Sequence, residues 1–400
     1  MRPPTTITLY PWYKFFQNLI FWQSVWFLYF QDVLSGAQAI ALYALYDLAT
    51  TVLEVPSGYL SDRVGRKFTL VLAAACAVLG MVCIVLGGSF AMFAAGQILL
   101  GASAAFASGT DSAILFESLV VEGRGDEVEA HELRAWRFTF VALALSALIG
   151  GAMASVAPAL PFAASAVAYC GMLWIALRLR EPERSKARVT EAVRLASLRA
   201  AIFHPVLGWL FALTVLMYGF SHLPFVFGQP FILQAMNGIG LAAQAPLVSG
   251  GVSAAMMVLS VLVSLMAVRM RAALGLTAIL LMAFAMQIAL VGFLSLTTSA
   301  WAIGLLLLRM VPNALSRPFI LARIQPLLHD DSRATYLSLQ SLGGRLLLAG
   351  SLLLAAQGAH QAGILPAADI ARILGWYAIG GVACLAMLIL VARRIKIETS

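Results

Sequence analysis

Apolar residues dominate the chain in long blocks, which short clusters of charged and turn-forming residues separate. Each block is about 20 residues long, the length that an α-helix needs to cross the roughly 30 Å hydrocarbon core of a bilayer. The pattern therefore predicts an all-α membrane protein with twelve transmembrane helices, six in each half of the chain. The expected spans are 13–32, 37–58, 69–87, 90–119, 135–156 and 159–179, then 206–228, 245–268, 272–293, 299–322, 334–356 and 373–392.

Composition supports lipid as the solvent of most side chains. Hydrophobic residues make up 62% of the chain and charged residues 11%, and the mean hydropathy is +0.92, which excludes an ordinary soluble surface. The first block lacks a small-residue cleavage pattern and runs into a second span, so we expect it to stay in the protein as a helix. The four cysteines lie inside apolar blocks without metal-ligand spacing and are interpreted as packing residues: Cys76, Cys83, Cys170 and Cys384.

The formal charge of +8 indicates topology and not nucleic-acid binding, because the basic residues form short clusters between spans. If the N-terminus is cytoplasmic, the outer loops contain Arg372 alone. The inner segments then hold Arg63, Arg66 and Lys67; Arg124, Arg134 and Arg137; residues 178–199; Arg269 and Arg271; Arg323 and Arg333; and Arg393, Arg394 and Lys396. We therefore expect a multi-pass protein of the bacterial cytoplasmic membrane with both termini in the cytoplasm.

A polar connector of mixed charge divides the chain into two halves. We place an N-terminal six-helix bundle at 1–180, a cytoplasmic linker at 181–205 and a C-terminal six-helix bundle at 206–400. Small apolar residues recur in the linker, which predicts either an amphipathic helix on the membrane surface, at 192–201, or a flexible connector. Six spans on each side of a central loop are typical of transporters that are built from two repeats.

The link between the second and third spans, GYLSDRVGRKFTL at residues 58–70, is a very short turn that is rich in charge. We expect Gly58 to allow a close approach of helices and Gly65 to occupy a backbone position that disfavours a Cβ atom. Asp62 can cap a helix or pair with Arg66.

These residues resemble the loop signature of the major facilitator superfamily, G-x-L-x-D-R-x-G-R-K-x-x-L, at every defining position. Residues 53–58, LEVPSG, also look like a bacterial branch of that superfamily. The resemblance implies two six-helix bundles that rock about a central cavity, with the outward-facing state stabilised by Asp62, Arg63, Arg66 and Lys67. Many proton-coupled drug exporters of the superfamily carry an Arg in the fourth span, where this chain has Gln97, so the resemblance does not imply that this chain couples protons by the drug-exporter route.

Ionisable residues inside spans are expensive and are candidates for function. For proton coupling the candidates are Asp47 and Glu54, which share one face of the second span with Thr50 and Thr51, together with Asp111 and His222. Each candidate also has a structural alternative. Asp47 and Asp111 could instead form structural ion pairs, and Glu54 could act as a latch between helices. His222 could simply be hydrogen-bonded. Separately, we expect Glu117 to pair with Arg134 or Arg137.

Substrate-binding candidates lie in the tenth and first spans. Arg309, Asn313 and Arg317 are spaced by four residues near Pro312 and Pro318, and they fit either a scaffold of ion pairs or a site for a carboxylate, phosphate or other anion. Trp22 and Trp26 fit either packing or a ligand. Arg345 in the eleventh span is expected to be a structural partner.

The sequence contains no motif that indicates an enzyme, a resident metal or another cofactor. We expect a monomeric secondary transporter that contacts membrane lipids and uses a proton gradient to export a small organic solute. Two alternatives stay open: an importer or facilitator of an anionic metabolite or siderophore, and a membrane sensor that does not transport.

Overall fold

The computed structural model describes residues 5–182, 204–324, 327–328, 330–359, 364–395 and 397, and every regular element in these ranges is a helix. The chain divides into two compact units. Met1–Lys186, Pro246–Gly251 and Gln361–Ile364 form the first unit, and Ala187–Ala245, Val252–His360 and Leu365–Ser400 form the second. Most of the predicted linker, including the expected amphipathic helix at 192–201, lies outside the described residues.

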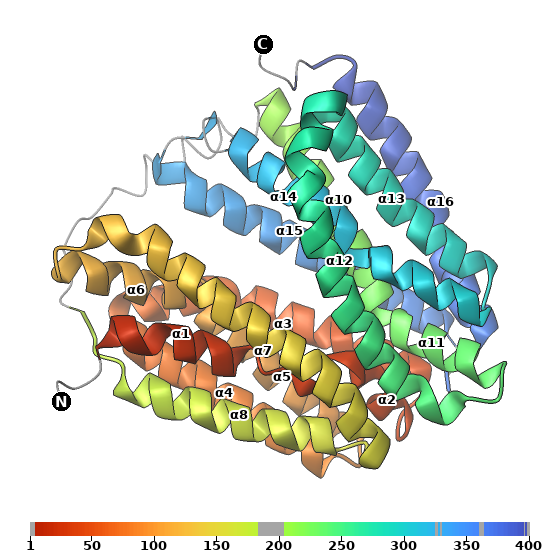
Figure 1. The fold of residues 1–400 in the computed structure, drawn as a ribbon, viewed down its shortest axis with the longest axis horizontal. Coiled ribbons are helices and arrows are strands. Elements are labelled where there is room, and N and C mark those ends of the chain that lie inside the picture. Colours follow the sequence, from red (N-terminus) through yellow and green to blue (C-terminus); the bar gives the residue numbers. More distant parts are fainter. Residues whose placement is uncertain are drawn as a thin grey trace. The chain divides into compact units, whose positions relative to one another are not determined.

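The first unit is a bundle whose long helices lie side by side (Figure 1). Its elements are α1 (Thr6–Gln17), η1 (Phe21–Ser24), α2 (Trp26–Gln31), α3 (Gly36–Arg63), α4 (Arg66–Leu86), α5 (Phe90–Ala107), α6 (Thr110–Val121), η2 (Gly125–Glu127), α7 (Val128–Val156) and α8 (Leu160–Arg178).

The second part of the chain also consists of α-helices and 3₁₀ segments. Its elements are α10 (Pro205–Val226), α11 (Gly228–Asn237), η3 (Ala242–Gln244), α12 (Ala245–Leu274), α13 (Leu276–Leu296), η4 (Ala300–Met310), α14 (Val311–Ile324), α15 (Asp330–Gly358) and α16 (Ala367–Ala392).

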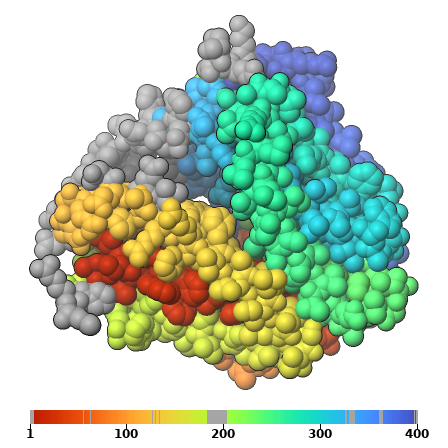
Figure 2. All heavy atoms as spheres, viewed as in Figure 1, coloured from red at the N-terminus to blue at the C-terminus, as the bar shows by residue number. Residues whose placement is uncertain are grey.

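Within the described residues, ten helical segments are long and apolar enough to cross a membrane. They match the third to the twelfth expected spans, and the first two expected spans correspond to α1–α2 and to α3. The exposed side chains of α12 are typical of a helix that faces lipid, since they include Val258, Val261, Leu262, Leu265 and Met266. Figure 2 shows this helix at the surface, in green.

Four of the expected spans are interrupted in the structure, a feature that the spans read from the sequence did not include. They are the first, fourth, seventh and tenth spans. In the fourth, Ser108 is extended (ψ 118°) and Gly109 is left-handed (φ 72°), which separates α5 from α6. In the seventh, Pro230 cannot donate to a carbonyl one turn earlier, and α10 ends before α11 begins.

The tenth span is a long 3₁₀ helix, η4, that becomes the α-helix α14 at Val311. Pro312 lacks the N–H that an α-helix would direct to Leu308, and the N–H of Val311 bonds to the Leu308 carbonyl instead. Long 3₁₀ segments are uncommon and often mark a hinge or a functional site.

The interruption of the first span depends on two other helices of the same unit. Ser165 of α8 bridges the gap, because its Oγ accepts from the Phe21 N–H (3.1 Å) and donates to the Leu19 carbonyl (3.3 Å). Gly150 of α7 lies so close that a Cβ atom there would be 1.9 Å from the Phe21 carbonyl oxygen. The polar backbone of the gap is therefore satisfied inside the bundle, as a membrane interior demands.

Candidate functional site

The signature loop forms a tight junction between α3 and α4. Helix α3 continues to Arg63, five residues past the predicted end of the second span, and the chain turns at Gly65 (φ 139°, ψ 151°) before α4 begins. The expected backbone role of Gly65 is confirmed. An added Cβ atom at Gly58 would have no neighbour within 4 Å in this structure, and the close approach of helices expected there stays a prediction.

An acidic residue far along the chain caps α4. The carboxylate of Glu181 accepts from the backbone N–H groups of Arg66 and Lys67, each at 2.7 Å. Gly65, the N-cap residue, has no side chain to cap the helix, and a Cβ atom added there would lie 3.0 Å from the Glu181 carboxylate. Glu181 thus replaces the missing cap and places a negative charge at the positive end of the helix dipole.

The side chain of Arg66 joins three elements of the first unit. Its Nε and Nη2 donate to the same oxygen of Glu117 on α6 (3.2 and 3.1 Å), and Nη1 donates to Ser61 Oγ on α3 (2.8 Å). Thr110 at the start of α6 also donates to Ser61, at 3.2 Å. The prediction that Glu117 pairs with Arg134 or Arg137 is therefore wrong, because the signature arginine occupies it.

The other charged residues of the signature have separate surroundings. The Arg63 guanidinium lies 4.9 Å from the ring centroid of Tyr59, one turn earlier on α3. The side chain of Asp62 lies outside the part of the chain that the structure describes. Lys67 contributes its backbone N–H to the Glu181 cap.

A partly buried ion pair, which we did not predict from the sequence, lies between the first and fourth spans. Lys14 Nζ of α1 lies 2.7 Å from the Oδ2 atom of Asp111 in the first turn of α6, and the two side chains are 23% and 10% exposed. Both belong to interrupted spans. Asp111 is thus a structural partner in this conformation, and Lys14 joins the candidate residues.

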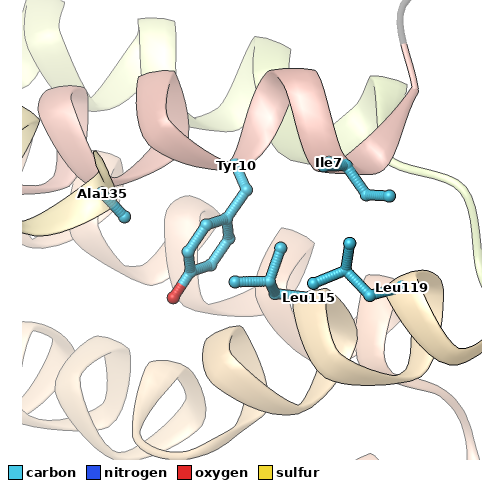
Figure 3. Packing of buried hydrophobic residues seen from close by; sticks show 5 residues of the cluster. All are labelled: Ile7, Tyr10, Leu115, Leu119 and Ala135. Carbon is cyan, nitrogen blue, oxygen red and sulfur yellow. The ribbon is translucent and has the colours of Figure 1, made fainter. Parts of the chain in front are cut away.

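Apolar packing and a polar network hold this pair in place. Figure 3 shows Ile7 and Tyr10 of α1 packed against Leu115 and Leu119 of α6, with Ala135 of α7 in the same cluster. The Tyr10 hydroxyl lies 3.4 Å from both carboxylate oxygens of Glu132 on α7, and Asn18 donates to the Lys14 carbonyl at 2.7 Å. The pair therefore sits among groups from three helices.

The remaining acidic candidates lie on α3. Asp47, Thr50 and Thr51 are buried, and Glu54 is half-buried one turn farther along the same face. Thr50 donates to the Tyr46 carbonyl at 2.8 Å, and Ser57 donates to the Glu54 carbonyl at 2.7 Å. The shared face of these residues follows from their spacing, and their roles in coupling stay predictions.

The aromatic candidates for substrate binding both contact other aromatic rings of the first unit. Trp26 is 1% exposed, stacks on Tyr43 (ring centroids 5.3 Å apart) and contacts Phe27 and Phe30 edge-on. Trp22 lies in η1, beside the gap in the first span, and stacks on Phe162 at 6.3 Å.

The three residues of the tenth-span stripe have different surroundings. Arg309, in the last turn of the 3₁₀ segment, is half-buried, with its guanidinium 4.8 Å from the ring centroid of Phe225 on α10. Asn313 accepts from Gln287 of α13 at 3.4 Å, while Arg317 is exposed. Their role in substrate binding stays a prediction.

His222 packs against its own helix, α10. Its Nδ1 lies 2.7 Å from the Tyr218 carbonyl oxygen, and its ring packs on the Tyr218 ring with centroids 4.2 Å apart. Arg345 of α15, which we expected to be a structural partner, donates from Nε to the Ser341 hydroxyl at 3.3 Å.

Outside the spans, a charged cluster follows α6. Arg124 donates to Glu127 at 2.8 and 2.7 Å, and these two hydrogen bonds lower the pKa of Glu127. Arg124 also donates to Glu122 at 3.1 Å. Among the described residues, no group of three or more His, Cys, Asp or Glu side chains is arranged to hold a metal ion.

Comparison with known proteins identifies the fold. The nucleoside transporter NupG superimposes with a TM-score of 0.74 at 13% identity, over 97% of this chain and 99% of that one. An auto-inhibited POT family peptide transporter gives 0.73 at 13% identity over 99% and 98% of the two chains, and a bacterial homologue of the human lysosomal transporter Spinster gives 0.69 at 14% over 99% and 97%.

No curated protein sequence matches the chain significantly. The family model of the Major Facilitator Superfamily matches residues 12–352, which is most of the chain and includes the signature loop. The resemblance that the loop indicated is confirmed, and with it the all-α transporter fold. The chain belongs to the major facilitator superfamily.

Proposed function

We propose that this protein is a secondary active transporter that exports a small organic solute in exchange for protons by alternating access. It works as a monomer in the bacterial cytoplasmic membrane, with both termini in the cytoplasm. The observation that carries the proposal is the ion pair between Lys14 and Asp111, which joins two interrupted spans inside the first unit.

The pair provides a simple way to couple a proton to a conformational change. A charge inside the membrane is costly unless it is paired, so Lys14 and Asp111 stabilise the packing of α1 on α6 while both are ionised. Protonation of Asp111 removes its charge and leaves Lys14 without its electrostatic partner. The preferred arrangement of α1 and α6 then changes, which is the kind of two-state element that coupling requires.

Solute identity comes from a binding screen. Ligands that bind the native state raise its apparent stability, so a thermal-shift screen of the purified protein selects the transported solute for the assay. The first panel contains nucleosides and peptides, because structural relatives are nucleoside and peptide transporters, together with small carboxylates.

The test uses everted vesicles and the selected solute. An imposed proton gradient should drive solute accumulation in the native protein. Asp111→Asn should abolish the dependence of accumulation on the proton gradient, while the solute still raises the apparent Tm of the variant. Lys14→Gln should alter the dependence of accumulation on the proton gradient. Glu122→Gln, which removes an exposed acid after α6, is the matched control and should behave as the native protein. Proton-driven accumulation that survives Asp111→Asn contradicts the coupling role.

The direction of transport is tested separately. If the solute accumulates in right-side-out vesicles under an inward proton gradient, the protein moves solute and protons in the same direction, and the proposal of exchange is wrong. An importer or facilitator of an anionic metabolite or siderophore is the second candidate, because the half-buried Arg309 of the second unit holds its guanidinium over the Phe225 ring of α10.

A further inference from the structure

We infer that the first unit binds an anionic phospholipid on the surface that α1 presents between α7 and α8, with the headgroup at the level of Arg134 and Arg178. This surface is called the α1 face below. The inference goes beyond the proposed transport function and does not depend on it. It is carried by the register of three helices and by the charges at one end of them.

Helix α1 reaches the surface of the first unit between two other helices. Figure 2 shows it in red, between α7 in yellow and α8 in yellow-green. At one end of its contact with α8, Thr6 Oγ1 accepts from the Arg180 N–H (2.9 Å) and donates to the Arg180 carbonyl (3.1 Å). At the other end, a Cβ atom added to Gly171 would lie 2.7 Å from the Phe16 ring. The two helices therefore run antiparallel and stay together between these points.

Helix α7 runs parallel to α1 on its other side. The Tyr10 hydroxyl lies 3.4 Å from the Glu132 carboxylate, and Asn18 donates to Thr139 at 3.4 Å. The start of α1, the start of α7 and the end of α8 thus lie at the same end of the bundle. Glu181, which follows α8, caps α4 there, so this end also holds the signature loop, for which we expect a cytoplasmic location.

An aromatic band crosses the α1 face about two turns from this end. Trp12 of α1 and Trp174 of α8 lie between the two contact points and are 46% and 53% exposed. Phe138 of α7 contacts Trp12 edge-on, with ring centroids 5.0 Å apart. Exposed tryptophans are typical of the level at which a membrane meets water. Side chains from three helices therefore mark that level on the α1 face.

Two exposed arginines lie on the water side of the aromatic band. Arg178 is one turn beyond Trp174, with its guanidinium 3.7 Å from the tryptophan ring centroid. Arg134 is one turn before Phe138 on the same face of α7. Neither arginine forms an ion pair with a residue that the structure describes. Because the ring covers only the flat face of a guanidinium, the N–H donors at its edge can bind a phosphate.

Aliphatic side chains lie on the membrane side of the band. Val141 and Leu145 follow Phe138 on the same side of α7, and Val167 lies one turn from Gly171 on α8; all three valine and leucine side chains are exposed. Charged groups, aromatic rings and aliphatic side chains thus succeed one another in the order of the headgroup, interface and acyl chains of a phospholipid. This order favours a lipid over a soluble anion.

The charge at this end favours a lipid with a net negative charge. The nearby acids have other contacts: Asp111 pairs with Lys14, Glu132 lies against Tyr10, and Glu181 caps α4. A lipid phosphate can therefore supply the counter-charge of the two arginines. The ammonium group of a zwitterionic headgroup would be repelled by them, whereas an anionic headgroup is attracted.

The experiment measures lipid binding to the full-length purified protein in detergent micelles, without a proton gradient. The apparent Tm is followed during titration with dioleoyl phosphatidylglycerol, with dioleoyl phosphatidylcholine and with the water-soluble headgroup glycerophosphoglycerol. Each arginine near a membrane surface contributes about fivefold in affinity, so we expect phosphatidylglycerol to bind about 5- to 25-fold more tightly than phosphatidylcholine. The soluble headgroup should leave the Tm unchanged.

Variants assign this preference to the α1 face. Arg134→Gln and Arg178→Gln should each weaken phosphatidylglycerol binding by about fivefold and leave phosphatidylcholine binding unchanged. Arg178→Lys should retain most of the preference because it keeps the charge. Arg271→Gln is the matched control, because Arg271 is an exposed arginine of the second unit that also lies over an aromatic ring, that of Phe319 at 5.6 Å; this variant should bind as the native protein does.

Three results would overturn the inference. One is equal affinity for phosphatidylglycerol and phosphatidylcholine, and another is a native preference in both Gln variants, which would place the lipid site elsewhere. The third is an equal rise of the Tm with the soluble headgroup, which would indicate a site for a soluble anion. Because no gradient is used, a lipid preference that depends on the two arginines supports this inference whether or not the protein shows proton-driven transport.

Discussion

The cap that Glu181 provides for α4 can be tested by its removal. Glu181→Ala deletes an acceptor of two backbone N–H groups, each at 2.7 Å. Water can replace the acceptor because the carboxylate is exposed, so the net loss is close to that of an ordinary N-cap, about 1 kcal/mol. For a folding unit of this size, that loss lowers the Tm by about 2–4 °C.

Gly65→Ala should cost more than the loss of the cap. The backbone at Gly65 has φ 139°, which strains any residue with a Cβ atom by about 1–3 kcal/mol. The added Cβ atom would also lie 3.0 Å from the Glu181 carboxylate and displace it. We therefore expect a loss of about 2–4 kcal/mol, the sum of the strain and the lost cap.

The double variant separates strain from capping. If Gly65→Ala acts partly by displacing Glu181, the loss of stability that it causes should be about 1 kcal/mol smaller in a protein that already carries Glu181→Ala. This difference is the interaction energy that a double-mutant cycle of the two residues measures. The assay is thermal unfolding of the purified protein at one scan rate, with Glu122→Ala as the control for loss of an exposed acid. Strictly additive losses would show that the two residues act independently and would refute the capping argument.

Two further predictions follow from other parts of the first unit. Gly150→Ala should prevent folding or destabilise the protein by several kcal/mol, because its Cβ atom would lie 1.9 Å from the Phe21 carbonyl oxygen. Gly58→Ala should be neutral or stabilising, because its Cβ atom would have no neighbour within 4 Å and alanine favours the helix. The yield and the Tm of the monodisperse protein measure the effect of each variant. Arg124 lowers the pKa of Glu127 in the folded protein below its value in the unfolded chain. The pair therefore contributes its full stabilisation of the fold above the unfolded-state pKa of Glu127, and this stabilisation is lost as the pH falls through the lower folded-state pKa. Arg124→Gln should therefore reduce the loss of Tm on acidification, and an unchanged pH profile would contradict this assignment.

Hydropathy predicted the helical membrane fold because each span must bury its own backbone hydrogen bonds, whatever its neighbours are. The signature loop added the family, since its glycine and basic residues satisfy local needs that are visible in the sequence. Gly65 is an example: its backbone conformation follows from the short turn, and the structure confirms it.

Partners from distant parts of the chain could not be predicted in the same way. Glu181 lies 115 residues from the Arg66 amide that it caps, and Asp111 lies 97 residues from Lys14. Many acids and bases in the chain are compatible with several partners, as the wrong assignment of Glu117 shows. Lys14 itself carried a usable signal, because a lysine inside the first apolar block needs a counter-charge.

The interrupted spans show where local sequence ceases to determine structure. Every third span is interrupted, as expected if each half contains two three-helix repeats. Three of the four interruptions have a local cause in Gly109, Pro230 or Pro312, and could be inferred from the sequence once the repeat is recognised. The first has neither glycine nor proline between residues 18 and 25, so its cause is tertiary: Ser165 satisfies the opened backbone and Gly150 leaves room for it. An interruption that two other helices maintain can close or shift when those helices move, which makes the first span the element of this unit best suited to transmit a change at Lys14 to the rest of the bundle.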